Sequence, residues 1–144
     1  MEIRKFRGEY DWLSNFYSVE IPYKGYIYPS VEHAFMSAKN ESKEWKVFCS
    51  NKNYTASETK LAGRLITLVP NWDKIKIQVM KDCISIKFNQ EPLKTKLINT
   101  GDVKIIEGNT WGDSYWGFDE NKQVGENYLG RIIMEFRDKL LVTT

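Results

Sequence analysis

The sequence contains few of the residues that form metal sites and disulfides. Its 144 residues include two cysteines, Cys49 and Cys83, and one histidine, His33. Zinc sites are built mainly from histidine and cysteine ligands, so no zinc site is expected. The two cysteines are expected to be free thiols in a reducing compartment, because nothing in the sequence indicates secretion.

Long apolar runs are also missing. No stretch of the sequence approaches the roughly 20 apolar residues of a transmembrane helix, and Met1 is followed at once by charged residues, unlike a signal peptide. The net charge of +2 at pH 7 permits anionic substrates but does not indicate a long nucleic-acid footprint. The expected protein is therefore cytoplasmic and has no membrane partner.

Aromatic residues, by contrast, are plentiful. They make up 14% of the chain, with five Trp and eight Tyr. Their flat faces and polar groups suit the stacking of a heterocycle, although they are equally useful in a core. With 42% apolar and 28% charged residues, the composition is that of an ordinary globular protein. The length predicts one domain over residues 1–144.

Apolar spacing and capping signals predict more helix than strand. A period of 3.6 residues, with N-cap residues or proline at the start, predicts helices at 30–39, 42–48, 55–66, 72–88, 92–101 and 128–141. Alternating apolar residues predict strands at 2–6 and 103–107 and a hairpin over 17–29, turning at Lys24-Gly25. Residues 10–16 and 108–125 are expected to be loops, the first of them packed. The predicted fold class is a compact, mostly helical α+β domain with a small β-sheet.

The predicted helix at 30–39 carries the residues on which the prediction of a functional site is based. Ser30 is its expected N-cap. A narrow apolar stripe must face a core, and it consists of Val31, Ala34, Phe35 and Ala38. Glu32 and Lys39 lie at the border of that stripe, roughly 10 Å apart along the axis at about 1.5 Å per residue. These two opposite charges would form the wall of a pocket about the size of a sugar.

Structural interpretations of the same residues stay open. A carboxylate in a first helical turn favours the helix dipole whatever its function, so Glu32 taken alone is more often structural. Lys39 taken alone is most often a solvated surface lysine. Trp111 and Trp116 would serve equally well in a core. Asp113 is more suggestive, because a carboxylate between two tryptophans is partly desolvated and its pKa then rises unless a donor compensates.

Four groups of motifs occur together in one order. They are Leu13-Ser14-Asn15-Phe16, Glu32-His33 with Lys39, Asp113-Ser114-Tyr115-Trp116-Gly117, and Gly125-x-Asn127-x-Leu129-Gly130. Shorter markers stand between and after them, namely Gly63-Arg64, Trp72, Met80, Lys87-Phe88, Glu107, Met134 and Arg137. Over nearly the whole chain this order and spacing resemble the YbiA-like family within the NADAR superfamily.

The resemblance implies an N-glycosidase, a hydrolase acting on N-glycosyl compounds. Family members cleave the bond between a ribose 5-phosphate and an amino-pyrimidine in early riboflavin-biosynthesis intermediates, the ribosylated diaminopyrimidine phosphates. Others in the superfamily remove ADP-ribose from modified guanine bases. The alternatives for this chain are such an ADP-ribose hydrolase, for which nucleic acid enters only as a modified substrate, or a module that binds ADP-ribose without cleaving it.

The resemblance also implies which residues act in catalysis. Cleavage of an N-glycoside builds positive charge at C1, and the leaving nitrogen needs a proton, so two carboxylates suit the chemistry. Glu32 and Asp113 would divide these roles, in either order. Lys39 would attack C1 as a neutral amine and form a Schiff base with the opened sugar. A direct ion pair with Glu32 would instead keep Lys39 charged, as an anchor for phosphate or ribose.

Substrate binding is assigned to further positions. Trp12, Trp111 or Trp116 would stack on the base, and Arg64 would hold a phosphate by a bidentate contact. The set is completed by Asn15 and Asn127. No metal or redox cofactor is implied, so chelators are expected to leave activity intact. The segment 118–122, Phe-Asp-Glu-Asn-Lys, replaces the Gly-rich segment of many members, which leaves the substrate identity open.

Overall fold

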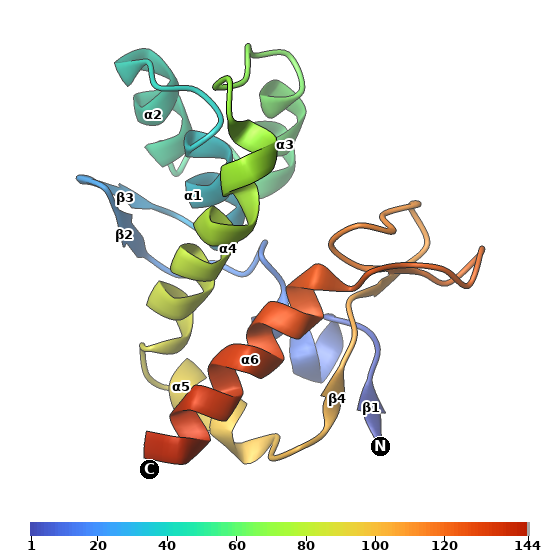
Figure 1. Ribbon diagram of the computed structural model, residues 1–144. Helices are drawn as coiled ribbons and strands as arrows, with labels where there is room; N and C mark the ends of the chain where they lie inside the picture. Colours follow the sequence, from blue (N-terminus) through green and yellow to red (C-terminus); the bar gives the residue numbers. More distant parts are fainter. Residues whose placement is uncertain (144) are drawn as a thin grey trace. The chain divides into compact units, whose positions relative to one another are not determined.

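The computed structural model describes residues 1–143, which fall into two compact units. The middle unit runs from Asn15 to Lys87, and the terminal unit combines Met1–Ser14 with the chain from Phe88 onwards. Helices dominate and the strands are short (Figure 1), so the predicted α+β class is confirmed. In the part of the chain that is described, no helix is long and apolar enough to cross a membrane.

The middle unit begins with a β-hairpin. Strands β2 (Ile21–Tyr23) and β3 (Tyr26–Tyr28) pair antiparallel. The turn residues Lys24 and Gly25 both have positive φ, at 48° and 92°, as a two-residue turn requires to match the twist of its strands. The predicted hairpin and its turn are confirmed, although the strands occupy less of the range 17–29 than expected.

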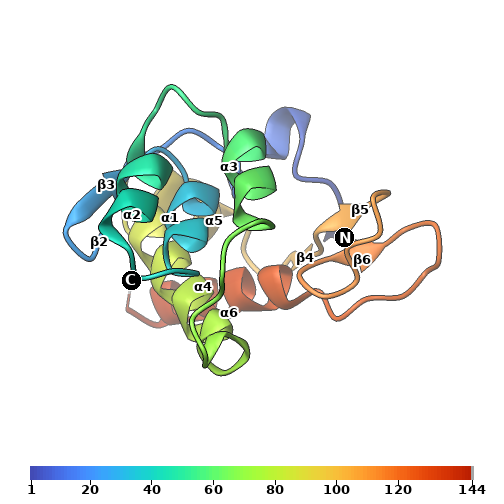
Figure 2. The ribbon, with the colours of Figure 1, turned by 90° about the horizontal axis from the view of Figure 1, so that it is seen from above.

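Three short helices follow the hairpin. Figure 2 shows α1 (Val31–Ser37) between α2 (Lys43–Ser50) and α3 (Ala56–Gly63), and α1 contacts both of them as well as the hairpin. Every residue of α1 is buried. The predicted stripe of Val31, Ala34, Phe35 and Ala38 is buried as expected. Burial is not confined to it, because neighbours cover α1 on several sides.

The starts of these helices were predicted better than their ends. The expected N-caps are present at Ser30, Ser42 and Thr55, the last as a complete capping box. α1 stops at Ser37 and not at Lys39, and α3 stops at Gly63 and not at Ile66. A side-chain cap marks each start in the sequence, whereas the two ends carry no such residue.

Helix α4 (Trp72–Phe88) has the bounds predicted from its apolar period. It buries Met80 and Cys83. The two cysteines, Cys49 and Cys83, are free and buried, and burial raises the pKa of both thiols, that of Cys49 to about 12. Neither thiol is therefore a ready nucleophile.

In the terminal unit, a long helix covers a short parallel strand pair. β1 (Glu2–Ile3) pairs with β4 (Lys104–Ile105), and α6 (Tyr128–Thr143) packs on β4 and on α5 (Leu93–Asn99) (Figure 1). Glycine is required at Gly130 of α6, because a Cβ there would collide with the carbonyl oxygen of Ile105 in β4. The predicted strands at 2–6 and 103–107 exist but are shorter.

Two regions predicted to be loops contain regular structure. β5 (Gly108–Asn109) pairs parallel with β6 (Phe118–Asp119) within the predicted loop 108–125. The 3-10 helix η1 (Gly8–Leu13) occupies most of the other, and it buries Trp12 and Leu13. The predicted packing of 10–16 is confirmed, and most of 108–125 is irregular as expected. The short helix and strands within them were missed because elements this short show no apolar period.

Candidate active site

Glu32 lies in the first turn of α1 and is buried, with 7% of its surface exposed. Its backbone N–H donates to the carbonyl oxygen of Asn15 at 3.0 Å. This bond connects the start of α1 to the backbone of Asn15. Carboxylates are seldom buried this deeply unless they are paired or hydrogen-bonded, so Glu32 is not a solvated residue of the first helical turn.

Asn15 places an unsatisfied acceptor beside that helix start. Its side chain is buried, and its Nδ2 donates to the sulfur of Met80 at 3.6 Å. Its Oδ1 is buried with no hydrogen-bond partner among the described residues. Because buried polar atoms are nearly always satisfied, an orphan acceptor indicates a position where a ligand or water donates.

Lys39 lies one residue beyond the C-cap of α1, so it is not on the helix as predicted. Its carbonyl accepts from the Val69 N–H at 2.8 Å, which fixes the backbone, and its Nζ lies over the Trp72 ring, 5.9 Å from the centroid. The side chain is half-buried. The Lys39 ammonium is thus partly removed from water and set against an aromatic face.

This setting lowers the pKa of Lys39. Burial is the largest cause, the charge of Glu32 opposes it, and the positive charges of Lys60, Arg64 and Lys76 add to it. A lowered pKa is what an amine nucleophile needs, since the neutral form reacts.

Arg64 follows α3 as its C-cap, and its side chain is exposed. The preceding Gly63 is buried against Met36 and Lys39: a Cβ at this position would lie 2.6 Å from the Met36 sulfur and 3.9 Å from Lys39 Cδ. Glycine at this position therefore brings the end of α3, with Arg64, close to Lys39.

Asp113 belongs to the terminal unit, in the segment between β5 and β6. Its Oδ1 accepts from the backbone N–H groups of Tyr115 and Trp116, both at 3.0 Å. The buried Asn109 fixes the backbone of Asp113: Oδ1 of Asn109 accepts from the Asp113 N–H at 3.0 Å, and its Nδ2 donates to the Asp113 carbonyl at 2.8 Å. The same Nδ2 lies 2.9 Å from Glu107 Oε2. Asn109 therefore organises both acidic residues.

The three candidate tryptophans have different surroundings. Trp12 is buried, its Nε1 donates to the Glu9 carbonyl at 2.9 Å, and its ring meets Phe88 edge-on. Trp116 is half-buried and lies edge-on to Tyr115 at 4.9 Å. Trp111 is 63% exposed. Among the three, Trp111 has the ring face most available for stacking.

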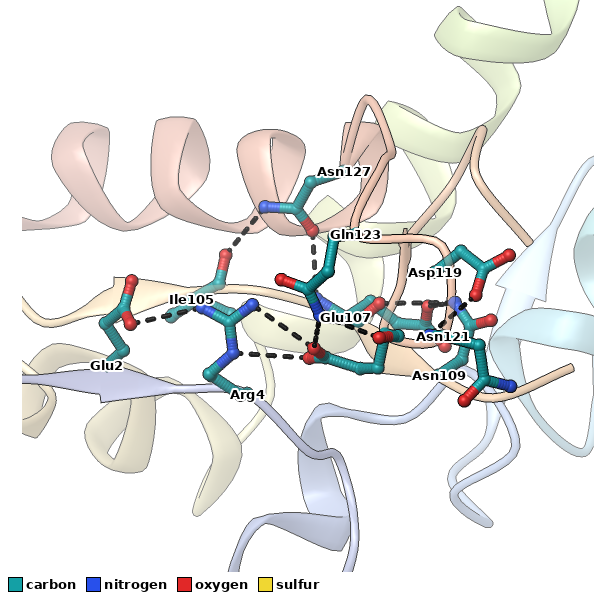
Figure 3. Close-up of polar contacts among 10 residues, drawn as sticks. Glu2, Arg4, Ile105, Glu107, Asn109, Asp119, Asn121, Gln123 and Asn127 are labelled. Carbon is teal, nitrogen blue, oxygen red and sulfur yellow. Dashed lines mark hydrogen bonds and ion pairs between the residues drawn. The ribbon is translucent and has the colours of Figure 1, made fainter. Parts of the chain in front are cut away.

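The side chain of Asn127 is engaged by the backbone (Figure 3). Its Oδ1 accepts from the Glu107 N–H at 2.9 Å, and its Nδ2 donates to the Ile105 carbonyl at 3.0 Å. Its φ is +52°, in the left-handed region that asparagine tolerates. Asn127 thus joins the end of β4 to the start of α6.

The predicted site residues therefore form one group in each unit. The middle unit brings together Asn15, Glu32, Lys39 and Arg64. In the terminal unit, Trp111, Asp113 and Trp116 share one loop, whereas Trp12 and Asn127 are held by other contacts. Within residues 1–143, no group of three or more His, Cys, Asp or Glu side chains is placed to hold a metal ion.

Sequence reasoning did not assign roles to several residues that shape these groups. They are Lys60, Trp72, Lys76 and Asn109. The i, i+4 spacing of Lys60 with Arg64 and of Trp72 with Lys76 was a detectable signal that each pair shares a helix face. Asn109 left no comparable signal, because its partners are backbone atoms brought close by the loop.

Comparison with known proteins shows the same fold and family. A NADAR domain model matches residues 4–141. N-glycosidase YbiA of Escherichia coli is 30% identical over 136 residues, which cover 93% of this chain and 84% of that protein. The NMR structure of E. coli YbiA has a TM-score of 0.86 at 27% identity, over 99% of this chain and 85% of that one.

A riboflavin biosynthesis protein of Vibrio vulnificus is 33% identical over 135 residues, which cover 90% of this chain but 35% of that protein. The predicted resemblance, and with it the prediction of a hydrolase acting on N-glycosyl compounds, is confirmed by these relatives. The family match spans residues from both units, and the chain belongs to the NADAR domain family.

Proposed function

We propose that this chain hydrolyses the N-glycosidic bond between a ribose phosphate and a nitrogen base, in early riboflavin-biosynthesis intermediates such as ribosylated diaminopyrimidine phosphates. The observation that carries the proposal is Lys39, a half-buried lysine over Trp72 whose pKa is lowered, with the charge of the buried Glu32 acting on it. The riboflavin protein of Vibrio vulnificus supports the substrate class. We also propose that residues 1–144 act as one YbiA-like domain.

The proposed reaction has two stages. Lys39 Nζ attacks C1 as the bond from C1 to the base nitrogen breaks, and that nitrogen takes a proton from one carboxylic acid. The attached amine loses one proton to a carboxylate. The bond from C1 to the ring oxygen O4 then breaks, the remaining N–H proton passes to O4, and a C1=N Schiff base forms. Water then adds to C1 and releases lysine and ribose phosphate. The net change is the addition of one water across the glycosidic bond.

Glu32 and Asp113 are the proposed acid and base. Glu32 is buried beside the Asn15 loop. Asp113 has one oxygen held by two backbone N–H groups, which orients the other oxygen. The proposed binding residues are Trp12, Asn15, Arg64, Trp111 and Trp116, with the orphan Oδ1 of Asn15 accepting from a substrate hydroxyl or N–H group. Asn127, also predicted as a binding residue, is proposed to act indirectly, through its bonds to the backbone of Glu107 and Ile105.

A second candidate is removal of ADP-ribose from modified guanine. The observation that favours it is the number of cations near Lys39, since a diphosphate carries more charge than a phosphate monoester. A module that only binds ADP-ribose is less well supported, because binding an anion does not require a lysine with a lowered pKa.

A product assay tests the proposal. The protein is incubated with the ribosylated diaminopyrimidine phosphate and, separately, with ADP-ribosylated guanosine, and released base is followed by mass spectrometry. Borohydride is added in parallel to trap a Schiff base on Lys39. We expect base release and a trapped sugar adduct in the wild type, and neither in Lys39→Arg.

Matched variants separate catalysis from folding. Glu32→Gln and Asp113→Asn are expected to lose turnover by a factor of about 10² or more, the usual share of a general acid or base. Lys74→Gln changes an exposed lysine of α4 and is expected to behave as wild type. A wild type that releases no base from either substrate, yet gains thermal stability from ADP-ribose, would replace the proposal with the binding module.

A further inference from the structure

Three cations stand around Lys39 in the middle unit. Lys60 and Arg64 are four residues apart, at the end of α3, so they project from one side of that helix together with Gly63. Gly63 lies against the Lys39 side chain. Lys60 and Arg64 are therefore directed to the side of α3 that meets Lys39.

The third cation comes from α4. Trp72 and Lys76 are four residues apart and share one side of α4, and Trp72 lies beneath the Lys39 ammonium. The charges of Lys60, Arg64 and Lys76 all act on Lys39. We call these three residues the basic rim.

The basic rim brings three positive charges to the surroundings of Lys39. Asp73 pairs with Lys76 at 3.1 Å, but its carboxylate is 90% exposed, so the pair is weak. The charge of Glu32 acts on Lys39 itself and opposes the effect of the rim. The Lys60 ammonium lies 5.8 Å from the centroid of the Phe16 ring, a contact that positions the ammonium without neutralising its charge. Collecting like charges costs free energy, which an anionic ligand would recover.

The chain segments that carry the rim are held in place by the backbone. Asn40 Nδ2 donates to the Thr67 carbonyl at 2.9 Å, and the Val69 N–H donates to the Lys39 carbonyl at 2.8 Å. These bonds join the segment after α1 to the connection between α3 and α4. The backbone segments near the three cations are therefore joined before any ligand arrives, which reduces the entropy lost on binding.

We propose that Lys60, Arg64 and Lys76 form a subsite for the phosphate monoester of the substrate and thereby select phosphorylated ribosides over free nucleosides. The inference rests on the proposed function, and it adds Lys60 and Lys76 to the predicted Arg64. Arg64 gives a planar, bidentate contact and the two lysines act as point charges.

A binding titration tests the subsite without chemistry. Ribose 5-phosphate, neutral ribose and ADP-ribose are titrated into the protein by calorimetry at low and at moderate salt. The wild type should bind ribose 5-phosphate and not ribose. Lys60→Gln and Arg64→Gln should each weaken that binding by about tenfold or more, since charge-assisted hydrogen bonds are worth about 1.5–3 kcal/mol. Lys74→Gln should bind as wild type does.

Kinetics provide the second readout. With the phosphorylated substrate, rim variants should show a raised KM, whereas with the dephosphorylated substrate KM should match that of the wild type. A fall in kcat should be equal for the two substrates, because it reflects the smaller lowering of the Lys39 pKa when one cation is removed. Arg64→Lys should recover part of the loss, because it keeps the charge and loses the bidentate geometry. Circular dichroism confirms that each variant is folded.

The outcomes separate this inference from the proposed function. Rim variants that bind ribose 5-phosphate as tightly as the wild type would overturn the subsite, and so would a wild type that binds ribose equally well. A wild type that binds ribose 5-phosphate but releases no base would overturn the N-glycosidase proposal and support the subsite. Tighter binding of ADP-ribose than of ribose 5-phosphate, lost in the same variants, would replace the monoester by a diphosphate.

Discussion

Asn127 offers the sharpest test of how the terminal unit is built. Its amide bonds to the Glu107 N–H at 2.9 Å and to the Ile105 carbonyl at 3.0 Å, and its backbone is left-handed with φ of +52°. Asn127→Ala removes both bonds and puts a Cβ without a polar group in a left-handed conformation. Both effects act on the folded state.

The expected cost follows from these contacts. A backbone group that loses its partner costs about 1–3 kcal/mol, and the left-handed conformation costs alanine about 1–2 kcal/mol. Asn127 is half-buried, so water reaches part of the gap and the lower ends of these ranges apply. We expect Asn127→Ala to reduce the free energy of unfolding by about 3–4 kcal/mol. Asn127→Gly should lose less, because glycine tolerates positive φ.

Urea unfolding measures these differences, with activity assayed where each variant is folded. Asn121→Ala is the matched control: its Nδ2 makes one exposed bond to the Thr110 carbonyl at 3.3 Å, and its loss should cost no more than about 0.5 kcal/mol. A folded Asn127→Ala with wild-type stability and a raised KM would refute the reasoning, since the amide would then bind substrate instead of the backbone.

Four further predictions concern the middle unit. Lys39→Met should abolish base release yet raise the free energy of unfolding at neutral pH, because the folded state holds the pKa of Lys39 below its usual 10.5. This gain in stability should shrink as the pH rises through the lowered pKa towards 10.5. Urea titrations at several pH values measure it, and an equal gain at every pH would contradict the prediction. For the wild type, kcat/KM should rise with pH and level off below 10.5, since the neutral amine reacts; a profile still rising at that pH would count against the nucleophile. Gly63→Ala would place a Cβ 2.6 Å from the Met36 sulfur, so it should lower stability by about 1–3 kcal/mol and lower kcat by displacing Lys39; unchanged kinetics would show that α3 does not position Lys39. Asn15→Ala removes an acceptor that has no partner, so thermal unfolding should change little while KM rises; a large loss of stability with unchanged KM would make Asn15 structural.

Local signals in the sequence were sufficient wherever neighbouring residues determine the structure. The capping box at Thr55, the positive-φ turn at Lys24-Gly25 and the apolar period of α4 depend on residues a few positions apart, and all three are present as predicted. The ordered motifs were likewise enough to predict the NADAR family and the N-glycosidase class.

Contacts between distant residues decided the rest. The sequence places Glu32 and Lys39 seven residues apart, but the lowered pKa of Lys39 depends on burial and on cations of α3 and α4 that only the folded chain brings near. From the sequence, Asn127 was predicted to cap a helix or to bind a ligand. In the structure, tertiary contacts engage its amide with the backbone of Ile105 and Glu107. The sequence determined which residues were available for chemistry. Only the tertiary structure decided how far each side chain is desolvated and which partners it has, because both depend on atoms remote along the chain.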